Sequence, residues 1–152
     1  MNEPAEFWRT AMRKGMGDTA FLRALGGILE GYAEGRGRIR LPFQPFLVGN
    51  PDTGVIHGGV LTALLDQACG MAVGSALRMP AMIATLDLRI DYMKPAQPET
   101  DLIIESECLK IAHEVAFTRG YAFQTTRDDP VAIATATFML TPLDALAQME
   151  KR

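Results

Sequence analysis

The sequence predicts an α+β domain in which a curved antiparallel sheet of about five to six strands wraps around one long buried helix. The first observation is a segment at residues 57–77 whose apolar side chains spread around the whole circumference of a helix, which is typical of a buried helix. The second is a series of strand-like segments after it, the last three separated by only a few residues. Such short connections exclude crossover helices, so consecutive strands are antiparallel.

One domain accounts for the chain. Its 152 residues match the usual size of a globular domain, and 48% of them are hydrophobic, which is enough for a core without disulfides or metals. We expect an N-terminal helical segment at residues 1–24, the domain at residues 25–142 and a tail at residues 143–152. The acidic start has no apolar segment behind it, and no apolar run reaches membrane length. The sequence therefore predicts a cytoplasmic protein without a signal peptide or membrane span.

Several elements precede the long helix. Residues 4–14 predict a short amphipathic helix. Its apolar stripe consists of Phe7, Trp8, Ala11 and Met12. Residues 28–34 and 38–41 have strand patterns, and Gly35-Arg36-Gly37 predicts the turn or bulge between them. The prolines and glycines of residues 42–54 predict an irregular loop.

Four strands follow the long helix. Residues 85–92 alternate strictly between polar and apolar, the period of a half-buried strand. The other strands are expected at residues 102–111, 115–125 and 131–140, with a turn at residues 127–130. Small residues on these strands would let the sheet approach the helix closely; they are Ala116, Gly120, Ala122, Ala132, Ala134 and Ala136.

The composition excludes several classes of function. The chain has 15 basic and 18 acidic residues, a net charge of −3, whereas nucleic-acid binding requires a basic excess on one face. Cys69 and Cys108 lack a paired ligand spacing, and the two histidines do not complete a zinc motif. We therefore expect no metal, no nucleic-acid partner and no membrane partner.

The chemistry is concentrated around the start of the long helix. A polar loop beginning at Asn50 ends in His57-Gly58-Gly59, where the helix begins, and the first N–H groups of a helix suit developing negative charge. Asp66 lies eight residues after Gly58, which is about 12 Å along the axis. One reacting carbonyl cannot touch both groups of one chain, so we predict a two-fold dimer that pairs each Gly58 with the partner's Asp66.

Small side chains surround this acid. The stripe on neighbouring turns of the helix consists of Gly59, Thr62, Asp66 and Gly70. Space beside a buried carboxylate predicts that a substrate binds there, so Gly59, Thr62 and Gly70 are candidate substrate-binding residues.

These residues belong to three ordered blocks with a specific spacing. The first contains His57-Gly58-Gly59 and Leu65-Asp66, the second is TLDLRIDYMKPA at residues 85–96, and the third contains Val115-Ala116-Phe117 and ATATF at residues 134–138. With these blocks, residues 25–142 resemble the hot-dog fold acyl-CoA thioesterases of the phenylacetate-degradation type. The resemblance implies a hot-dog fold and hydrolysis of an acyl-CoA at a site shared between two protomers.

The resemblance also implies roles for single residues. Asp66 corresponds to the acid that acts as nucleophile or general base, and the Gly58 amide to the group that polarises the thioester carbonyl. Asn50 corresponds to the loop asparagine and Thr85 to a strand hydroxyl that faces the site. The family implies a homo-oligomer, commonly a dimer of dimers, and no cofactor other than the CoA of the substrate.

The sequence departs from the family pattern at three places. Asn50 stands seven residues before His57 instead of six, and Gly70 replaces a hydroxyl residue one helical turn after the acid. Ala112-His113-Glu114 replaces a Gly-Arg-Ser turn. In the mechanism that the resemblance implies, Thr85 would have to hold the attacking water alone.

Each candidate also has a structural interpretation. Asp66 could be a structural tie, but the surrounding motif favours a functional role. For His57 we favour ordering of the loop and helix start over general-base catalysis. Cys69 has no convincing base partner for nucleophilic work, and solvated charges are the simpler explanation of Arg89 and Lys94.

Two hypotheses remain beside thioester hydrolysis. The first is an enoyl thioester hydratase or dehydratase on the same fold, where a histidine and an acid share proton transfer. The second is a non-catalytic acyl-CoA-binding module, which the changes at Asn50 and Gly70 keep open. Hydration of crotonyl-CoA would identify the first, and tight binding without thiol release would identify the second.

Overall fold

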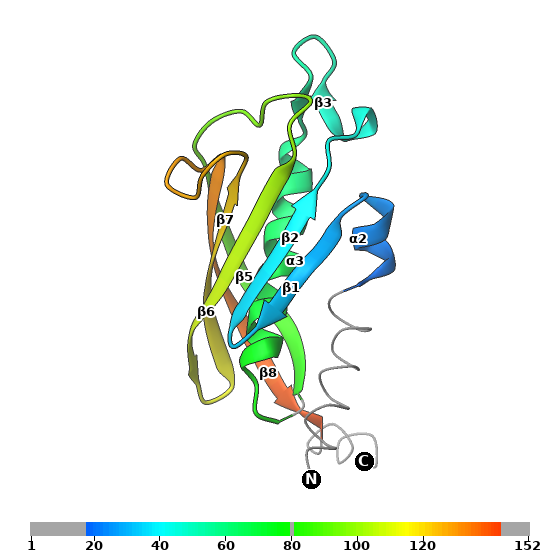
Figure 1. The fold of residues 1–152 in the computed structure, drawn as a ribbon. Coiled ribbons are helices and arrows are strands. Elements are labelled where there is room, and N and C mark those ends of the chain that lie inside the picture. The colour runs from blue at the N-terminus through cyan, green and yellow to red at the C-terminus, as the bar shows by residue number, and fades with distance from the viewer. Residues whose placement is uncertain (1–17, 80, 144–152) are drawn as a thin grey trace.

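The computed structural model describes residues 18–79 and 81–143 (Figure 1). In chain order its elements are α2 (Ala20–Ala24), β1 (Ile28–Ala33), β2 (Arg36–Leu41), the 3-10 helix η2 (Pro45–Leu47), β3 (Val48–Asn50), β4 (Val55–Ile56), α3 (Gly58–Ala76), β5 (Ala81–Tyr92), β6 (Leu102–Ala112), β7 (Val115–Phe123) and β8 (Ala132–Pro142). The helix expected at residues 4–14 lies outside the described residues, as does nearly all of the expected tail. The proposed division of the chain at residues 24 and 142 remains a prediction.

Six strands form one antiparallel sheet in the order β1-β2-β6-β7-β8-β5, and β3 pairs with β4 in a small separate sheet. The long helix α3 lies against the inner face of the curved sheet (Figure 1). The predicted α+β architecture, a curved sheet around one helix, is therefore confirmed. β1 and β5 form the two edges of the sheet.

The core lies between α3 and the sheet. Helix side chains such as Leu61, Leu64 and Leu65 are fully buried against strand residues such as Ile39 and Ile104. α3 is long and apolar enough to cross a membrane by length and composition, but more than half of it is buried inside the protein. Its apolar circumference is thus explained by its position in the core.

The small residues on β7 and β8 permit this close packing. A Cβ on Gly120 would lie 3.0 Å from Cδ2 of Leu65 and 3.1 Å from Sγ of Cys69. The expected close approach of the sheet to the helix is confirmed there, because even a methyl group would crowd two core side chains.

The first hairpin turns one residue earlier than the sequence suggested. β2 begins at Arg36, and the turn consists of Glu34 and Gly35, with φ of 51° and 79°. Two consecutive positive φ values are typical of the tight turns that suit the twist of a hairpin. The prediction of a turn at residues 35–37 was wrong because Gly37 pairs with Tyr32 inside the ladder.

The strict alternation predicted for residues 85–92 is also wrong. Thr85 pairs with Phe138 and Asp87 with Thr137, so Leu86 is an unpaired extra residue, a β-bulge. The bulge shifts the two-residue side-chain period by one position. As a result Thr85 and Tyr92, which strict alternation would place on opposite faces, both point toward α3.

The loop before α3 is more ordered than expected. It contains η2 and the β3–β4 pair, and the His57 N–H donates to the Leu47 carbonyl over 2.8 Å. A Cβ on Gly49 would lie 2.8 Å from Cα of His57, so the loop backbone packs directly on that residue. The short helix α2 lies within the expected N-terminal helical segment at residues 1–24, beyond the helix expected at residues 4–14, and has Thr19 as its N-cap.

Candidate functional site

His57 ends the loop and caps α3. Its backbone is extended, and its Nδ1 accepts a hydrogen bond from the Gly59 N–H over 2.9 Å. Side chains that accept from the first N–H groups stabilise the start of a helix. This geometry supports the interpretation of His57 as the residue that orders the loop and the helix start.

The cap leaves one backbone donor free. Val60 N–H bonds to the His57 carbonyl over 2.9 Å, and Gly59 N–H bonds to the His57 ring. Within residues 18–79 and 81–143, no group accepts a hydrogen bond from the Gly58 N–H. This N–H stands at the positive end of α3, where it can bind an oxygen that carries partial negative charge.

Tyr92, the last residue of β5, fixes the backbone beside that donor. Its hydroxyl donates to the Gly58 carbonyl over 3.1 Å and lies 2.7 Å from Oγ1 of Thr62. Thr62 in turn donates to the same carbonyl over 3.2 Å. A Cβ on Gly58 would lie 3.4 Å from the Tyr92 ring, so the ring also covers this glycine.

The sequence did not identify Tyr92 as a site residue. The strict alternation of residues 85–92 placed it among apolar side chains. Tyr92 does share a face with Leu88 and Ile90, which pack against the core, but the pattern gave no sign that its hydroxyl reaches Gly58. Thr62 was expected to contact substrate, but its hydroxyl contacts Gly58 and Tyr92 instead. A substrate contact of Thr62 remains a prediction.

Asp66 lies one helical turn beyond Thr62 and is half-buried rather than buried. Thr85 Oγ1 donates to Asp66 Oδ1 over 2.9 Å. Among the described residues, Oδ2 has no hydrogen-bond donor. The hydroxyl therefore orients the carboxylate while leaving one oxygen available to a reactant, and Thr85 contacts the acid of its own chain.

Gly58 and Asp66 lie in one continuous helix. Eight residues of α-helix place them about 12 Å apart along the axis. The expected separation is therefore present, and a single carbonyl group cannot contact both within one chain.

The other predicted site residues have different surroundings. Asn50 is exposed, and its side chain accepts a hydrogen bond from the Asp52 N–H over 3.0 Å, so it shapes its own loop. Gly59 is exposed and Gly70 is buried. The catalytic role of Asn50 and the substrate contacts of both glycines remain predictions.

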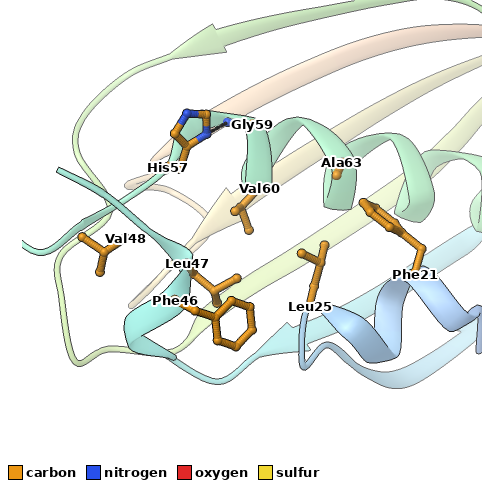
Figure 2. A pocket seen from close by; sticks show the side chains of 9 residues that line it. All are labelled: Phe21, Leu25, Phe46, Leu47, Val48, His57, Gly59, Val60 and Ala63. Carbon is orange, nitrogen blue, oxygen red and sulfur yellow. Dashed lines mark hydrogen bonds between the residues drawn. The ribbon is translucent and has the colours of Figure 1, made fainter. Parts of the chain in front are cut away.

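An apolar furrow opens beside the start of α3 (Figure 2). We call it the α2–α3 furrow; its volume is about 420 Å³. It is lined by Phe21, Leu25, Phe46, Leu47, Val48, His57, Gly59, Val60 and Ala63. Figure 2 shows side chains from α2 and η2 facing those of the first turns of α3.

Three other polar residues singled out from the sequence have surroundings typical of structural residues; they are Cys69, Arg89 and Lys94. Burial raises the pKa of the Cys69 thiol to about 11, so this cysteine is protonated and unreactive at neutral pH. Arg89 pairs with Asp91 and Lys94 with Asp129. Residues 18–79 and 81–143 contain no group of three His, Cys, Asp or Glu side chains that could hold a metal.

The family model of the thioesterase superfamily matches residues 53–130. This chain therefore belongs to the thioesterase superfamily, and its fold is the hot-dog fold that the sequence resemblance implied. The match includes the start of α3, Asp66 and Thr85.

Individual relatives agree with this assignment. The medium/long-chain acyl-CoA thioesterase YigI of Escherichia coli K12 is 34% identical over 133 residues, 79% of this chain and 84% of YigI. A Halobacterium salinarum protein is 37% identical over 101 residues, which are 64% of this chain. The matched part is 66% of the Halobacterium protein, so this chain spans a little under two thirds of that relative's length. A mutant of the phenylacetic acid degradation protein PaaI from Thermus thermophilus is 25% identical, with a TM-score of 0.70, covering 80% of this chain and 98% of the PaaI chain.

Proposed function

We propose that this protein hydrolyses acyl-CoA thioesters to the free acid and CoA at a site shared by two copies of the chain. The Gly58 N–H of one copy binds the thioester carbonyl oxygen, and the partner's Asp66 acts as nucleophile or general base. The observation that carries the proposal is a free helix-start N–H and a carboxylate oriented by Thr85, both on one helix of a thioesterase-superfamily chain. CoA enters as part of the substrate, and the reaction needs no separate cofactor.

The edge strand β5 supports a shared site. β5 has 12 residues and lies at the end of the sheet, and an unpaired edge of this length can pair with another strand. It also contacts both functional groups, because Thr85 bonds to Asp66 and Tyr92 bonds to Gly58. Two β5 strands paired antiparallel about a two-fold axis near Leu88 would bring each Gly58 toward the partner's Asp66.

The proposed chemistry balances with water alone. Asp66 removes a proton from water, and the resulting hydroxide attacks the carbonyl carbon; alternatively Asp66 attacks that carbon itself and water hydrolyses the anhydride. In both routes the C–S bond breaks, negative charge passes through the carbonyl oxygen, and CoA leaves as the thiolate and takes up a proton. The Gly58 N–H stabilises the oxygen when its charge is greatest.

Hydrolysis fits the site better than hydration of an enoyl thioester. A hydratase that used His57 as its base would need an unprotonated ring nitrogen facing the substrate. Nδ1 of His57 accepts from Gly59, so in the neutral ring Nε2 carries the proton and cannot act as the base. Incubation with crotonyl-CoA separates the two reactions, because hydrolysis releases free thiol and hydration does not. A binding module without catalysis would retain acyl-CoA and release no thiol over hours.

The first experiment is a thiol-release screen over short-chain, long-chain and aryl CoA esters with the wild-type protein and Asp66→Asn. We expect turnover by the wild type and none by the variant. An Asp66→Asn variant with full activity on the same ester would refute the role of this carboxylate.

A second experiment tests the sharing of the site. Gly58→Pro removes the N–H at a position where helices tolerate proline, and Gly58→Ala adds a side-chain carbon but keeps the N–H. We expect Gly58→Pro to reduce kcat by about 100-fold or more relative to Gly58→Ala, the usual effect of losing one oxyanion donor. The extended backbone of His57 also suits a following proline.

Mixing the two inactive variants gives the sharper result. In a mixed dimer of Gly58→Pro and Asp66→Asn, one of the two shared sites contains a normal Gly58 and a normal Asp66. After random exchange of equal amounts, about a quarter of the wild-type activity should return. If no activity returns although exchange is complete, the site lies within one chain and the proposal is wrong.

A further inference from the structure

We propose that the α2–α3 furrow binds the acyl chain of the thioester, and that Ala63 and Phe46 determine which chain lengths are accepted. The inference rests on the proposed function and adds the class of substrate, a CoA ester with an unbranched medium or long chain. It concerns residues that have no part in the proposed chemistry.

The position of the furrow is the first argument. His57 and Gly59 line its upper end (Figure 2), and Gly58, whose free N–H is proposed to hold the carbonyl oxygen, lies between them in the chain. Val60 and Ala63 follow in the same helix and line the furrow on the α3 side (Figure 2). A chain attached to a carbonyl at Gly58 can therefore enter the furrow without crossing a charged group.

The lining is the second argument. Apart from His57 and the Gly59 backbone, every lining side chain is apolar. Phe21 and Phe46 are 58% and 64% exposed, and large apolar side chains in water gain stability when they contact an apolar ligand. Such a surface fits a hydrocarbon chain and excludes the phosphates of CoA.

The size is the third argument. The furrow volume of about 420 Å³ lies within the usual range of small-molecule sites. A cavity of about 150 Å³ holds benzene, with its six carbons. The furrow therefore has room for a chain of more than about ten carbons, and a two-carbon acetyl group would leave most of it empty.

These arguments predict how activity depends on chain length. Each methylene that enters the furrow should raise kcat/KM about fourfold, until the furrow is full. The wild type is assayed with a series of straight-chain acyl-CoA esters from acetyl to palmitoyl. We expect a steep rise from butyryl to decanoyl and a plateau after it.

Variants of the lining test the location. Ala63→Phe places a ring in the furrow, and we expect at least a tenfold loss of kcat/KM for decanoyl-CoA and longer esters, with butyryl-CoA within twofold of wild type. The matched control is Ala33→Phe, at an exposed alanine of β1. It stands beside the β1–β2 turn, where a Cβ on Gly35 would lie 3.6 Å from Cβ of Ala76 at the C-terminal end of α3. The control should keep the wild-type profile.

Phe46→Ala provides an independent measurement, because this exposed side chain contributes little to the core. It should flatten the rise with chain length by removing one wall, while butyryl-CoA hydrolysis stays unchanged. If no ester is hydrolysed by the wild type, the proposed function itself fails. If esters are hydrolysed but Ala63→Phe and Phe46→Ala both retain the wild-type profile, the chain binds elsewhere and the inference is overturned.

Discussion

The hydroxyl of Tyr92 offers a specific test of how the oxyanion donor is positioned. Tyr92→Phe removes one oxygen atom and keeps the ring that covers Gly58. The lost group makes two contacts, at 3.1 Å to the Gly58 carbonyl and 2.7 Å to Thr62 Oγ1. Thr62 still donates to the same carbonyl over 3.2 Å, so the helix start keeps one of its two ties.

The magnitude follows from these contacts. A hydrogen bond between uncharged groups contributes about 0.5–1.5 kcal/mol. At a partly solvated position we expect a loss of about 1 kcal/mol, which lowers the melting temperature by about 2–4 °C for a domain of this size. The lost hydrogen bond also positions the Gly58 N–H toward the carbonyl oxygen of the transition state. If the full 1 kcal/mol, roughly, is lost from transition-state binding, kcat should fall about fivefold while KM stays within twofold.

The assay measures kcat and KM by thiol release and the melting temperature by circular dichroism. Tyr121→Phe is the matched control. Tyr121 lies on β7, and the guanidinium of Arg127 stacks 4.0 Å from the centroid of its ring. Within the described residues, Tyr121 makes no hydrogen bond to α3. This variant should leave kcat unchanged. If Tyr92→Phe melts at a lower temperature but retains the wild-type kcat, the hydroxyl only stabilises the fold. Equal losses of kcat in Tyr92→Phe and Tyr121→Phe would also refute the positioning role.

Four other outcomes are expected. Asp66→Asn should keep the fold, as judged by its melting curve, and abolish thiol release; full activity would remove the mechanism. Thr85→Val should lower kcat by about 10- to 100-fold, since hydrogen bonds to charged groups contribute about 1.5–3 kcal/mol, whereas Thr135→Val on β8 should have no effect in the same assay. His57→Asn should destabilise the start of α3 and weaken substrate binding as well as rate; loss of rate with intact binding would instead indicate a catalytic base. Because burial raises the pKa of Cys69 from about 9 to about 11, the unfolded thiol loses its proton at a pH where the native thiol keeps it. The free energy of unfolding should therefore fall between about pH 9 and 11, by at most about 3 kcal/mol from Cys69. Urea titrations of Cys69→Ala should show a shallower slope, because burial also raises the pKa of Cys108 and that thiol remains.

The long helix was predictable because its information is local. Residues 57–77 are apolar on every side, and the structure places α3 at Gly58–Ala76. The two glycines after His57 and the position of Asp66 are fixed by their spacing along one helix, so their separation of about 12 Å follows from helix geometry alone. The proposal that a second chain completes the site rests on the same number.

The strands were predictable in order but not in register. Antiparallel pairing followed from the short connections, yet the bulge at Leu86 has no clear local marker, because the strand alternates through it. A bulge arises from how two strands fit against each other and against the helix, which a single strand does not reveal. The side of the sheet on which Thr85 lies therefore depended on the pairing of β5 with β8.

The sequence by itself determined the helix, its capped glycine start and the carboxylate two turns further on, because these depend on composition and on a repeat of 3.6 residues. Tertiary structure alone decided that Thr85 orients Asp66, that Tyr92 holds Gly58, and that α2 and η2 form an apolar furrow beside them. The two hydrogen bonds join residues 19 and 34 positions apart in the chain. Such contacts are set by how the elements pack, and no local pattern encodes the packing.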